Sequence, residues 1–210
     1  MIRPMKPTSN AEGNLVSKVL SVQFAPIAAD ASLLRKAGIV LAGSALLAVC
    51  AHVALPLYFT PVPLTMQTLA VLLIGLVLSP RLAAATLGAY LIEGSLGLPV
   101  FAPSLLGVSG LAHLFGPTGG YLFAYPLAAA MTSFLWRRSK REFFAAALSA
   151  AAGSLQILAL GAVWLVVFSH ASLHNVLTLA VIPFLPGDAL KIVAAAALAT
   201  GFVSLRRQTK

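Results

Sequence analysis

Long apolar segments with almost no charge dominate this sequence. There are six of them, at residues 37–58, 64–79, 82–98, 119–136, 143–169 and 187–205. A helix needs about 20 apolar residues to cross the hydrocarbon layer of a membrane, and each segment meets or approaches that length. The segments also lack the alternation of polar and apolar residues that barrel strands require. We therefore expect an all-α integral membrane protein, a bundle of six transmembrane helices.

The composition excludes several other classes of protein. Of the 210 residues, 60% are hydrophobic and only 9% are charged, whereas a soluble domain carries about a quarter charged residues. The 14 Lys and Arg outnumber the 5 Asp and Glu, but almost none of the basic residues lies within the apolar segments, so we expect no nucleic-acid partner. Cys50 is the single cysteine, and no disulfide framework is possible.

The positions of the basic residues predict the orientation in the membrane. Thirteen of the 14 Lys and Arg lie at alternate ends of the expected helices, and the opposite connections, at 59–63, 99–118 and 170–186, contain none. Because basic residues are enriched on the cytoplasmic side, both termini are expected there. The basic run at 137–141 fits a topology determinant, with binding of anionic lipid as the alternative.

The ends of the chain differ from its apolar middle. A segment beginning at Lys18 resembles a secretory signal, but its apolar core is short and broken by Gln23 and Pro26. We expect a flexible cytoplasmic arm at 1–35, a six-helix membrane domain at 36–206 and a cytoplasmic tail at 207–210. A further apolar piece, 176–185, is too short to span and is expected to be a half-helix or a surface segment.

The connections on the outer side are uncharged and rich in Phe, Tyr, Leu and Pro. They read LPLYFTPVPL, LPVFAPSLLGVSGLAHLFGPTGG and IPFLPGD. Such sequences favour rigid covers over a pocket, although an aromatic belt in the headgroup region is the alternative. Within the second connection, Gly119 and Gly120 permit close approach of the backbone to a ligand or a helix.

Five polar side chains of the apolar segments are candidates for a functional role, at His52, Gln67, Glu93, Asp188 and Lys191. At about 1.5 Å per helical residue, all five lie in the outer half of the membrane. An ion path would need polar groups across its whole depth, so this placement predicts a blind pocket that is open to the outside. Charged groups inside a membrane are costly and usually functional.

Each of these groups also has a structural interpretation. Asp188 could act as a helix N-cap or pair with Lys191, three residues further along the same helix face. Lys191 is the only basic residue at the outer end, which favours an anionic ligand group. Glu93 fits a ligand contact and a packing contact equally well, and His52 fits a core histidine better than a ligand contact.

Motifs for catalysis, metals and nucleotides are missing from the sequence. His113, His170 and His174 do not have the spacing of metal ligands, and there is no phosphate-binding loop or His-Glu-x-x-His motif. We expect no enzyme activity, no catalytic residue, no metal and no cofactor. Energy for uphill transport would have to come from another polypeptide.

Small residues four apart on the first segment predict a face for a partner helix. They form two pairs, Gly38 with Ala42 and Ser44 with Ala48. Small side chains allow the backbones of two membrane helices to approach closely.

Four motifs follow one another along the chain, PVPLTMQTL, GLPVFA, GPTGGY and LPGDALKI. Together they resemble one family, the BioY family of biotin-specific substrate-binding (S) components of energy-coupling factor (ECF) transporters, and the resemblance covers about residues 37–205. It implies a six-helix S-component in the bacterial plasma (inner) membrane that captures biotin from outside with high affinity. The alternative is a self-sufficient secondary transporter or facilitator for biotin or a related small anionic solute.

The resemblance also implies partners and a ligand site. The partners would be a membrane coupling subunit, contacted through the small residues of the first segment, and two ATP-hydrolysing subunits, although some members work without dedicated partners. Asp188 would accept hydrogen bonds from the ureido ring of biotin, and Lys191 would pair with a ligand oxygen. Gln67 and Glu93 would complete the polar contacts. Aromatic walls would come from Tyr58, Phe59, Tyr90, Phe101 and Tyr121.

Overall fold

The structure is a computed structural model that describes residues 31–103 and 107–208, with the backbone alone at 31 and at 206–208. Two compact units are distinguished, Met1–Lys36 and Ala37–Lys210, and of the first only the start of one helix is described. The predicted arm at 1–35 therefore lies almost wholly outside the described residues, as do residues 209 and 210 of the predicted tail. These boundaries stay predictions.

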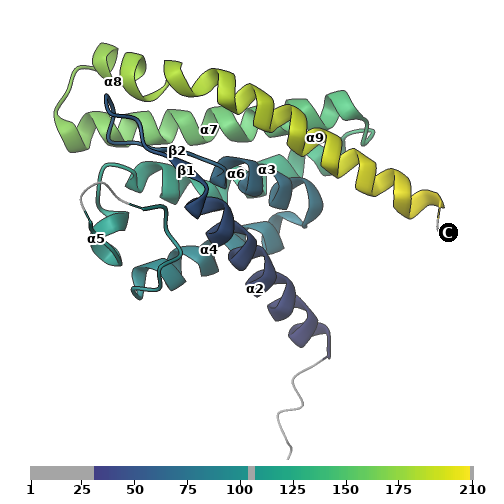
Figure 1. The fold of residues 1–210 in the computed structure, drawn as a ribbon. Helices are drawn as coiled ribbons and strands as arrows, with labels where there is room; N and C mark the ends of the chain where they lie inside the picture. The colour runs from purple at the N-terminus through teal and green to yellow at the C-terminus, as the bar shows by residue number, and fades with distance from the viewer. Residues whose placement is uncertain (1–30, 104–106, 209–210) are drawn as a thin grey trace, which may run out of the picture. The chain divides into compact units, whose positions relative to one another are not determined.

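Helices make up most of the described chain (Figure 1). In chain order the elements are α2 (Ala31–His52), β1 (Ala54–Leu55), β2 (Leu64–Thr65), α3 (Gln67–Val77), α4 (Pro80–Ser95), α5 (Leu111–Leu114), α6 (Gly119–Arg138), α7 (Phe143–Ser169), α8 (Leu173–Ala180), the 3₁₀ turn η1 (Ile182–Phe184) and α9 (Leu185–Gln208). Each apolar segment of the sequence overlaps one of the longer helices, so a mostly helical fold is confirmed, with β1 and β2 as two short strands that the sequence analysis does not predict.

Three helical stretches of the described residues are long and apolar enough to cross a membrane. They are Ser32–His52, Phe143–Ser169 and Leu173–Leu205. By contrast, α3 has 11 residues, and at about 1.5 Å per residue it is shorter than a hydrocarbon layer of about 30 Å. The number of six spans and the orientation of the termini stay predictions.

The first apolar segment is helical over less of its length than the sequence predicts. The helix α2 ends at His52 rather than near residue 58, because Pro56 disfavours helical backbone at the residue before it. The chain then forms a short antiparallel pair in which Ala54 faces Thr65 and Leu55 faces Leu64. This pair holds the connection 56–63 as a loop at the start of α3.

Proline and glycine fix the limits of α4. Pro80 occupies its first turn, where a missing N–H costs nothing, and Gly97 follows its end with a φ of 92°, a conformation that favours glycine. Further along, the apolar piece at 176–185 forms α8 and η1, which confirms the expected half-helix.

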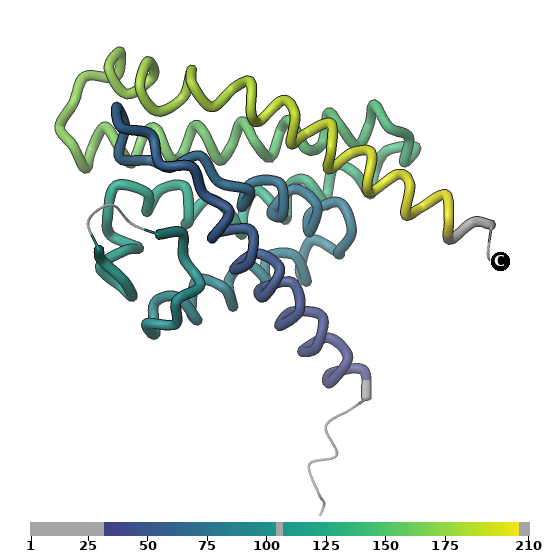
Figure 2. Tube along the Cα trace, in the orientation of Figure 1, coloured from purple at the N-terminus to yellow at the C-terminus, as the bar shows by residue number. Residues whose placement is uncertain are grey.

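The helices α6 and α7 pack closely against each other, and α9 lies along α7 and α3 (Figures 1 and 2). A Cβ added at Gly120 of α6 would lie 2.1 Å from Cβ of Trp164 on α7, and one added at Gly161 of α7 would lie 2.3 Å from the ring of Tyr121. Real Cβ atoms do not approach so closely, so both positions require glycine. We call this contact, made by Gly120, Trp164, Gly161 and Tyr121, the α6–α7 seam.

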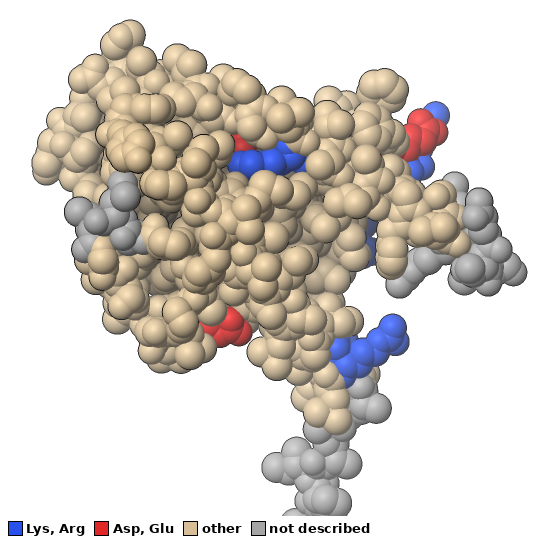
Figure 3. Space-filling view, in the orientation of Figure 1, with Lys and Arg blue, Asp and Glu red and all other residues tan. Residues whose placement is uncertain are grey.

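The outer surface is apolar over wide areas. Leu41 and Val49 of α2, Leu148 and Leu155 of α7 and Leu190 of α9 are all more than half exposed. One face carries few charged groups, and within it a basic and an acidic group meet (Figure 3). Such a surface suits contact with lipid rather than water.

Candidate binding site

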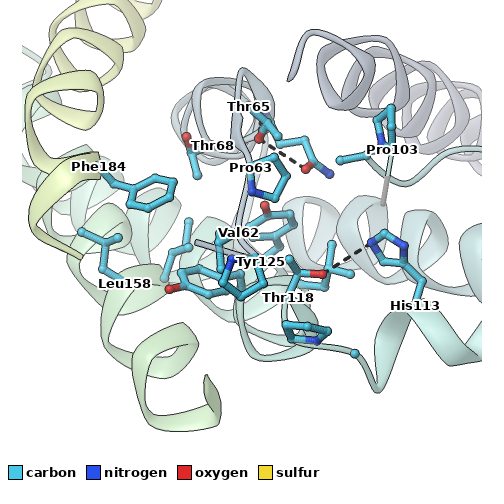
Figure 4. Close-up of a pocket in the computed structure, with 18 of the residues that line it drawn as sticks. Val62, Pro63, Thr65, Thr68, Pro103, His113, Thr118, Tyr125, Leu158 and Phe184 are labelled. Carbon is cyan, nitrogen blue, oxygen red and sulfur yellow. Dashed lines mark hydrogen bonds between the residues drawn. The ribbon is translucent and has the colours of Figure 1, made fainter. Parts of the chain in front are cut away.

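One cavity in the second unit gathers residues that are far apart in the sequence (Figure 4). It has a volume of about 190 Å³. Its wall comes from β2 and the loop before it, from α3, from α5 and the chain on both sides of it, and from α6, α7, η1 and α9. The lining residues are Pro61, Val62, Pro63, Thr65, Gln67, Thr68, Ala102, Pro103, Val108, His113, Gly116, Pro117, Thr118, Tyr121, Leu122, Tyr125, Ile157, Leu158, Phe184, Asp188 and Lys191.

The proline-rich connections of the sequence contribute directly to this wall. Pro61 and Pro63 come from the first of them, and Pro103 and Pro117 from the second. Proline fixes its own backbone torsion, so these connections present apolar rings to the cavity at little entropic cost. Parts of these connections thus lie in the wall of a cavity, and their action as rigid covers stays a prediction.

A buried ion pair lies in the cavity wall. Nζ of Lys191 is 3.2 Å from Oδ1 of Asp188 and 2.8 Å from the hydroxyl of Thr68, to which it donates. The hydroxyl of Ser154 donates to Oδ2 of Asp188 at 3.0 Å. The side chains of Lys191 and Asp188 are only 9% and 7% exposed. The pair thus joins α9 to α3 and α7 and places one acceptor and one donor at the cavity.

The local sequence explains how this pair forms. Asp188 lies in the first turn of α9 and Lys191 follows three residues later, so both occupy the same face of the helix. Beyond them α9 is rich in alanine, and Ala195, Ala196 and Ala199 are buried. Small side chains let α9 approach α3 and α7 closely enough for Thr68 and Ser154 to reach the ion pair.

A second polar chain begins at Gln67 at the start of α3. Nε2 of Gln67 donates to the hydroxyl of Tyr90 at 2.7 Å, and that hydroxyl donates to the carbonyl of Val100 at 2.8 Å. Gln67 is 3% exposed and Tyr90 is fully buried. Tyr90 therefore lies behind the side-chain amide of Gln67 and links it to the backbone of Val100, just before Ala102 and Pro103 in the cavity wall.

Two tyrosines of α6 form much of the apolar wall. The ring of Tyr121 packs over Gly161, and its hydroxyl donates to the carbonyl of Ala180 at 3.0 Å. Tyr125 lies one helical turn further along and is 4% exposed. Because the α6–α7 seam leaves no space behind Tyr121, its position in the cavity wall is fixed.

Polar groups also lie on the far side of the cavity from η1. The imidazole of His113 stacks on Phe101, with ring centroids 5.1 Å apart and planes at 29°. Its Nδ1 is 3.3 Å from the carbonyl of Val108, and its Nε2 is 3.5 Å from the hydroxyl of Thr118. Burial lowers the pKa of His113, although the Val108 carbonyl acts weakly in the opposite direction.

Four of the site residues predicted from the sequence line the cavity together, namely Gln67, Tyr121, Asp188 and Lys191. They come from three helices, and the structure brings them around one space. That they contact a ligand stays a prediction. Asp188 is not the N-cap of α9, because the helix begins at Leu185, and its carboxylate bonds to Ser154 and Lys191.

The other predicted site residues lie away from the cavity lining. Tyr90 and Phe101 are buried behind it and contact each other edge to face, with ring centroids 5.4 Å apart. Glu93 accepts a hydrogen bond from Ser44 of α2. Tyr58 is fully exposed and Phe59 is 53% exposed. Their role as ligand contacts stays a prediction that this structure does not test.

The predicted partner face of α2 divides into two parts. Gly38 and Ala42 are exposed, and a Cβ at Gly38 would meet nothing within 4 Å. Ser44 is buried through its contact with Glu93, and Ala48 is half-buried against the core. Contact of this face with a partner stays a prediction.

Several polar residues of the site were not singled out from the sequence. Thr68, Ser154, Thr118 and Tyr125 belong to residue types that are common in apolar helices, and only helix packing shows that they reach the cavity. His113 stands out in the sequence only as a histidine without the spacing of metal ligands. Across residues 31–103 and 107–208, no group of three or more His, Cys, Asp or Glu could hold a metal ion.

Comparisons with known proteins point to one family. The sequence profile of the BioY family matches residues 19–208. A probable biotin transporter BioY of Pyrococcus horikoshii is 39% identical over 140 residues, which is 66% of this chain and 79% of that protein. The biotin transporter BioY of Thermotoga maritima is 36% identical over 166 residues, which is 79% of this chain and 92% of that protein.

A solved structure shares the fold. It is a crystal structure of the S-component for biotin from an ECF-type ABC transporter. The two structures superpose with a TM-score of 0.75 at 23% sequence identity, covering 83% of this chain and 94% of the other.

Proposed function

This chain belongs to the BioY family, and we propose that it is a membrane-embedded S-component that captures biotin with high affinity in the cavity between α3, α6, α7 and α9. It acts in biotin uptake and catalyses no reaction of its own. The observation that carries this proposal is the Asp188–Lys191 pair, which presents one acceptor and one donor inside an otherwise largely apolar cavity.

The chemistry of biotin suits this arrangement. Its ureido ring offers two N–H donors and one carbonyl, and the rest of the molecule is an apolar thioether ring and chain that ends in a carboxylate. Asp188 accepts from the ureido N–H groups, and Lys191 donates to the ureido oxygen. Charge-assisted hydrogen bonds of this kind are strong where water is excluded. Tyr121, Tyr125 and Leu158 pack against the apolar rings.

The remaining features follow from the same proposal. The protein crosses the plasma membrane six times with both termini in the cytoplasm, so that the cavity faces outward. A coupling subunit contacts α2 on the exposed side near Gly38 and Ala42, and two ATP-hydrolysing subunits drive import. The apolar exposed face of α2 supports such a contact, because small residues allow two helices to approach closely.

Calorimetry on the purified protein in detergent tests the ligand. We expect saturable binding of one biotin per chain and no binding of thiamine or riboflavin. Asp188→Asn and Lys191→Met should each abolish measurable binding, whereas Glu142→Gln, at an exposed carboxylate at the start of α7, should bind as the unchanged protein does. A folded sample that does not bind biotin would contradict the proposal.

A further inference from the structure

A second polar site in the cavity stands apart from the Asp188–Lys191 pair. His113 and Thr118 lie on one side of the cavity, opposite Phe184 of η1, which directly precedes α9 (Figure 4). His113 is 6% exposed, and both residues line the cavity. Neither residue has a part in the proposed recognition of the ureido ring.

The contacts of His113 fix the tautomer of its neutral ring. The carbonyl of Val108 can only accept, so Nδ1, at 3.3 Å, carries a proton and donates. Burial disfavours a second proton and lowers the pKa of His113, so without ligand Nε2 holds a lone pair, and the hydroxyl of Thr118 donates to it at 3.5 Å. Thr118 precedes α6, but its side chain makes no capping hydrogen bond there, so its hydroxyl can turn to another acceptor.

The charged and titratable groups around the cavity are already engaged with other partners. On α9, Asp188 and Lys191 pair with each other. On α6, the hydroxyl of Tyr121 donates to Ala180. On α4, against which α5 packs, Glu93 accepts from Ser44. None of these described groups is hydrogen-bonded to His113. The remaining titratable side chain of the lining, Tyr125, is a neutral phenol.

An acidic ligand would bring a charge into a cavity whose ionisable groups have no net charge. The Asp188–Lys191 pair has no net charge, and His113 is neutral, so a ligand carboxylate would introduce a single unbalanced negative charge. A buried charge without a partner is costly, and a nearby group changes its protonation state instead. His113 is positioned to do so, because its Nε2 lone pair faces the cavity side that holds Thr118.

We propose that His113 and Thr118 form the subsite for the carboxylate of the ligand and that Nε2 of His113 takes up one proton from solvent as the ligand binds. The Thr118 hydroxyl turns from Nε2 to the carboxylate, a new N–H bond forms at Nε2, and this N–H donates to the carboxylate. The ligand keeps its charge, and the imidazolium balances it. This inference rests on the proposed function, since it takes biotin as the acidic ligand.

Linked proton uptake can be measured by calorimetry. Near pH 6, close to the ordinary pKa of histidine of about 6.5, the binding enthalpy is recorded in buffers that differ in heat of ionisation. We expect biotin to bind with uptake of a substantial fraction of a proton, and biotin methyl ester to bind with none. As the pH falls toward 6, the affinity for biotin should rise by up to about tenfold for each unit by which the ligand raises the pKa of His113.

Two variants locate the proton. His113→Gln should remove the uptake and the pH dependence, whereas His174→Gln, at an exposed histidine of α8, should leave both unchanged. Uptake that persists in His113→Gln, or that is equal for biotin and its ester, would overturn the assignment. The comparison of acid and ester shows whether the proton is linked to the ligand carboxylate, and the ¹⁵N chemical shifts of the imidazole decide between Nε2 and that carboxylate even if His113→Gln does not fold. Absence of any biotin binding would instead contradict the proposed function itself.

Discussion

The buried ion pair allows a quantitative prediction of stability. Lys191→Met keeps most of the length of the side chain but removes Nζ, which lies 3.2 Å from Asp188 and 2.8 Å from Thr68. Among the described contacts, Asp188 then retains only the hydrogen bond from Ser154 at 3.0 Å. Its charge stays in a position where the side chain is 7% exposed.

Removing one partner of a buried pair costs about 3–5 kcal/mol, because the other charge is left without compensation. In the double variant Asp188→Asn with Lys191→Met no charge remains, and the amide that replaces the carboxylate can still accept from Ser154. The cost of the double variant should be limited to the lost hydrogen bonds, about 1–2 kcal/mol. We therefore expect the second substitution to restore much of the stability that the first removes.

Reversible unfolding of the ligand-free protein in mixed micelles measures this difference, since bound ligand would add its own stabilisation. The two single variants, the double variant and the unchanged protein together form a double-mutant cycle. Leu190→Met, at a 74% exposed position of the same helix, serves as the control for a methionine in α9. If the double variant is as unstable as Lys191→Met or less stable, the uncompensated charge is not the cause.

Three further predictions concern other contacts. Gly161→Ala would place a Cβ 2.3 Å from the ring of Tyr121. We therefore expect a loss of about 1–3 kcal/mol in unfolding free energy and weaker biotin binding in calorimetry. If both values are unchanged, the close packing of Tyr121 on Gly161 is contradicted. Ser44→Ala removes the hydrogen bond to Glu93 and should cost about 1–3 kcal/mol, and an unaltered unfolding curve would argue against this contact. Since burial lowers the pKa of His113, its contribution to stability is fully present above about pH 6.5, the value for an unfolded histidine, and is lost as the pH falls toward the folded value. Unfolding curves of the ligand-free protein should show this loss, and His113→Gln should reduce it.

The sequence was sufficient to predict the residues at the centre of the cavity because charges in an apolar segment are rare. Asp188 and Lys191 stand out in α9, and their spacing of three residues already places them on one face. Gln67 stands out in the same way at the start of α3. The helical class followed from the length of the apolar segments, whereas α4, at Pro80–Ser95, begins two residues and ends three residues before the predicted segment 82–98.

Other parts of the site depend on how the helices are rotated about their axes. Counting residues along the expected helix predicts a depth for Glu93 but not the direction of its side chain, and in the structure Glu93 faces Ser44 of α2. Ser154 and Thr68 have no distinguishing pattern, because their roles depend on how α7 and α3 are placed against α9. The exposed position of Tyr58 follows from the early end of α2, since the chain leaves the helix at His52 and continues as a loop.

The α6–α7 seam has a consequence for the exit of a ligand. If α6 slid along α7 by one residue, Tyr121 would replace Gly120 against Trp164, or Leu160 or Ala162 would replace Gly161 beneath Tyr121. Each shift would bring a side chain into space that holds only hydrogen. The two helices therefore cannot slide past each other while they stay packed, and we expect them to move as one body. If biotin binds in the cavity as we propose, it leaves through displacement of another part of the wall, such as the loop between β1 and β2 that carries Pro61 and Pro63.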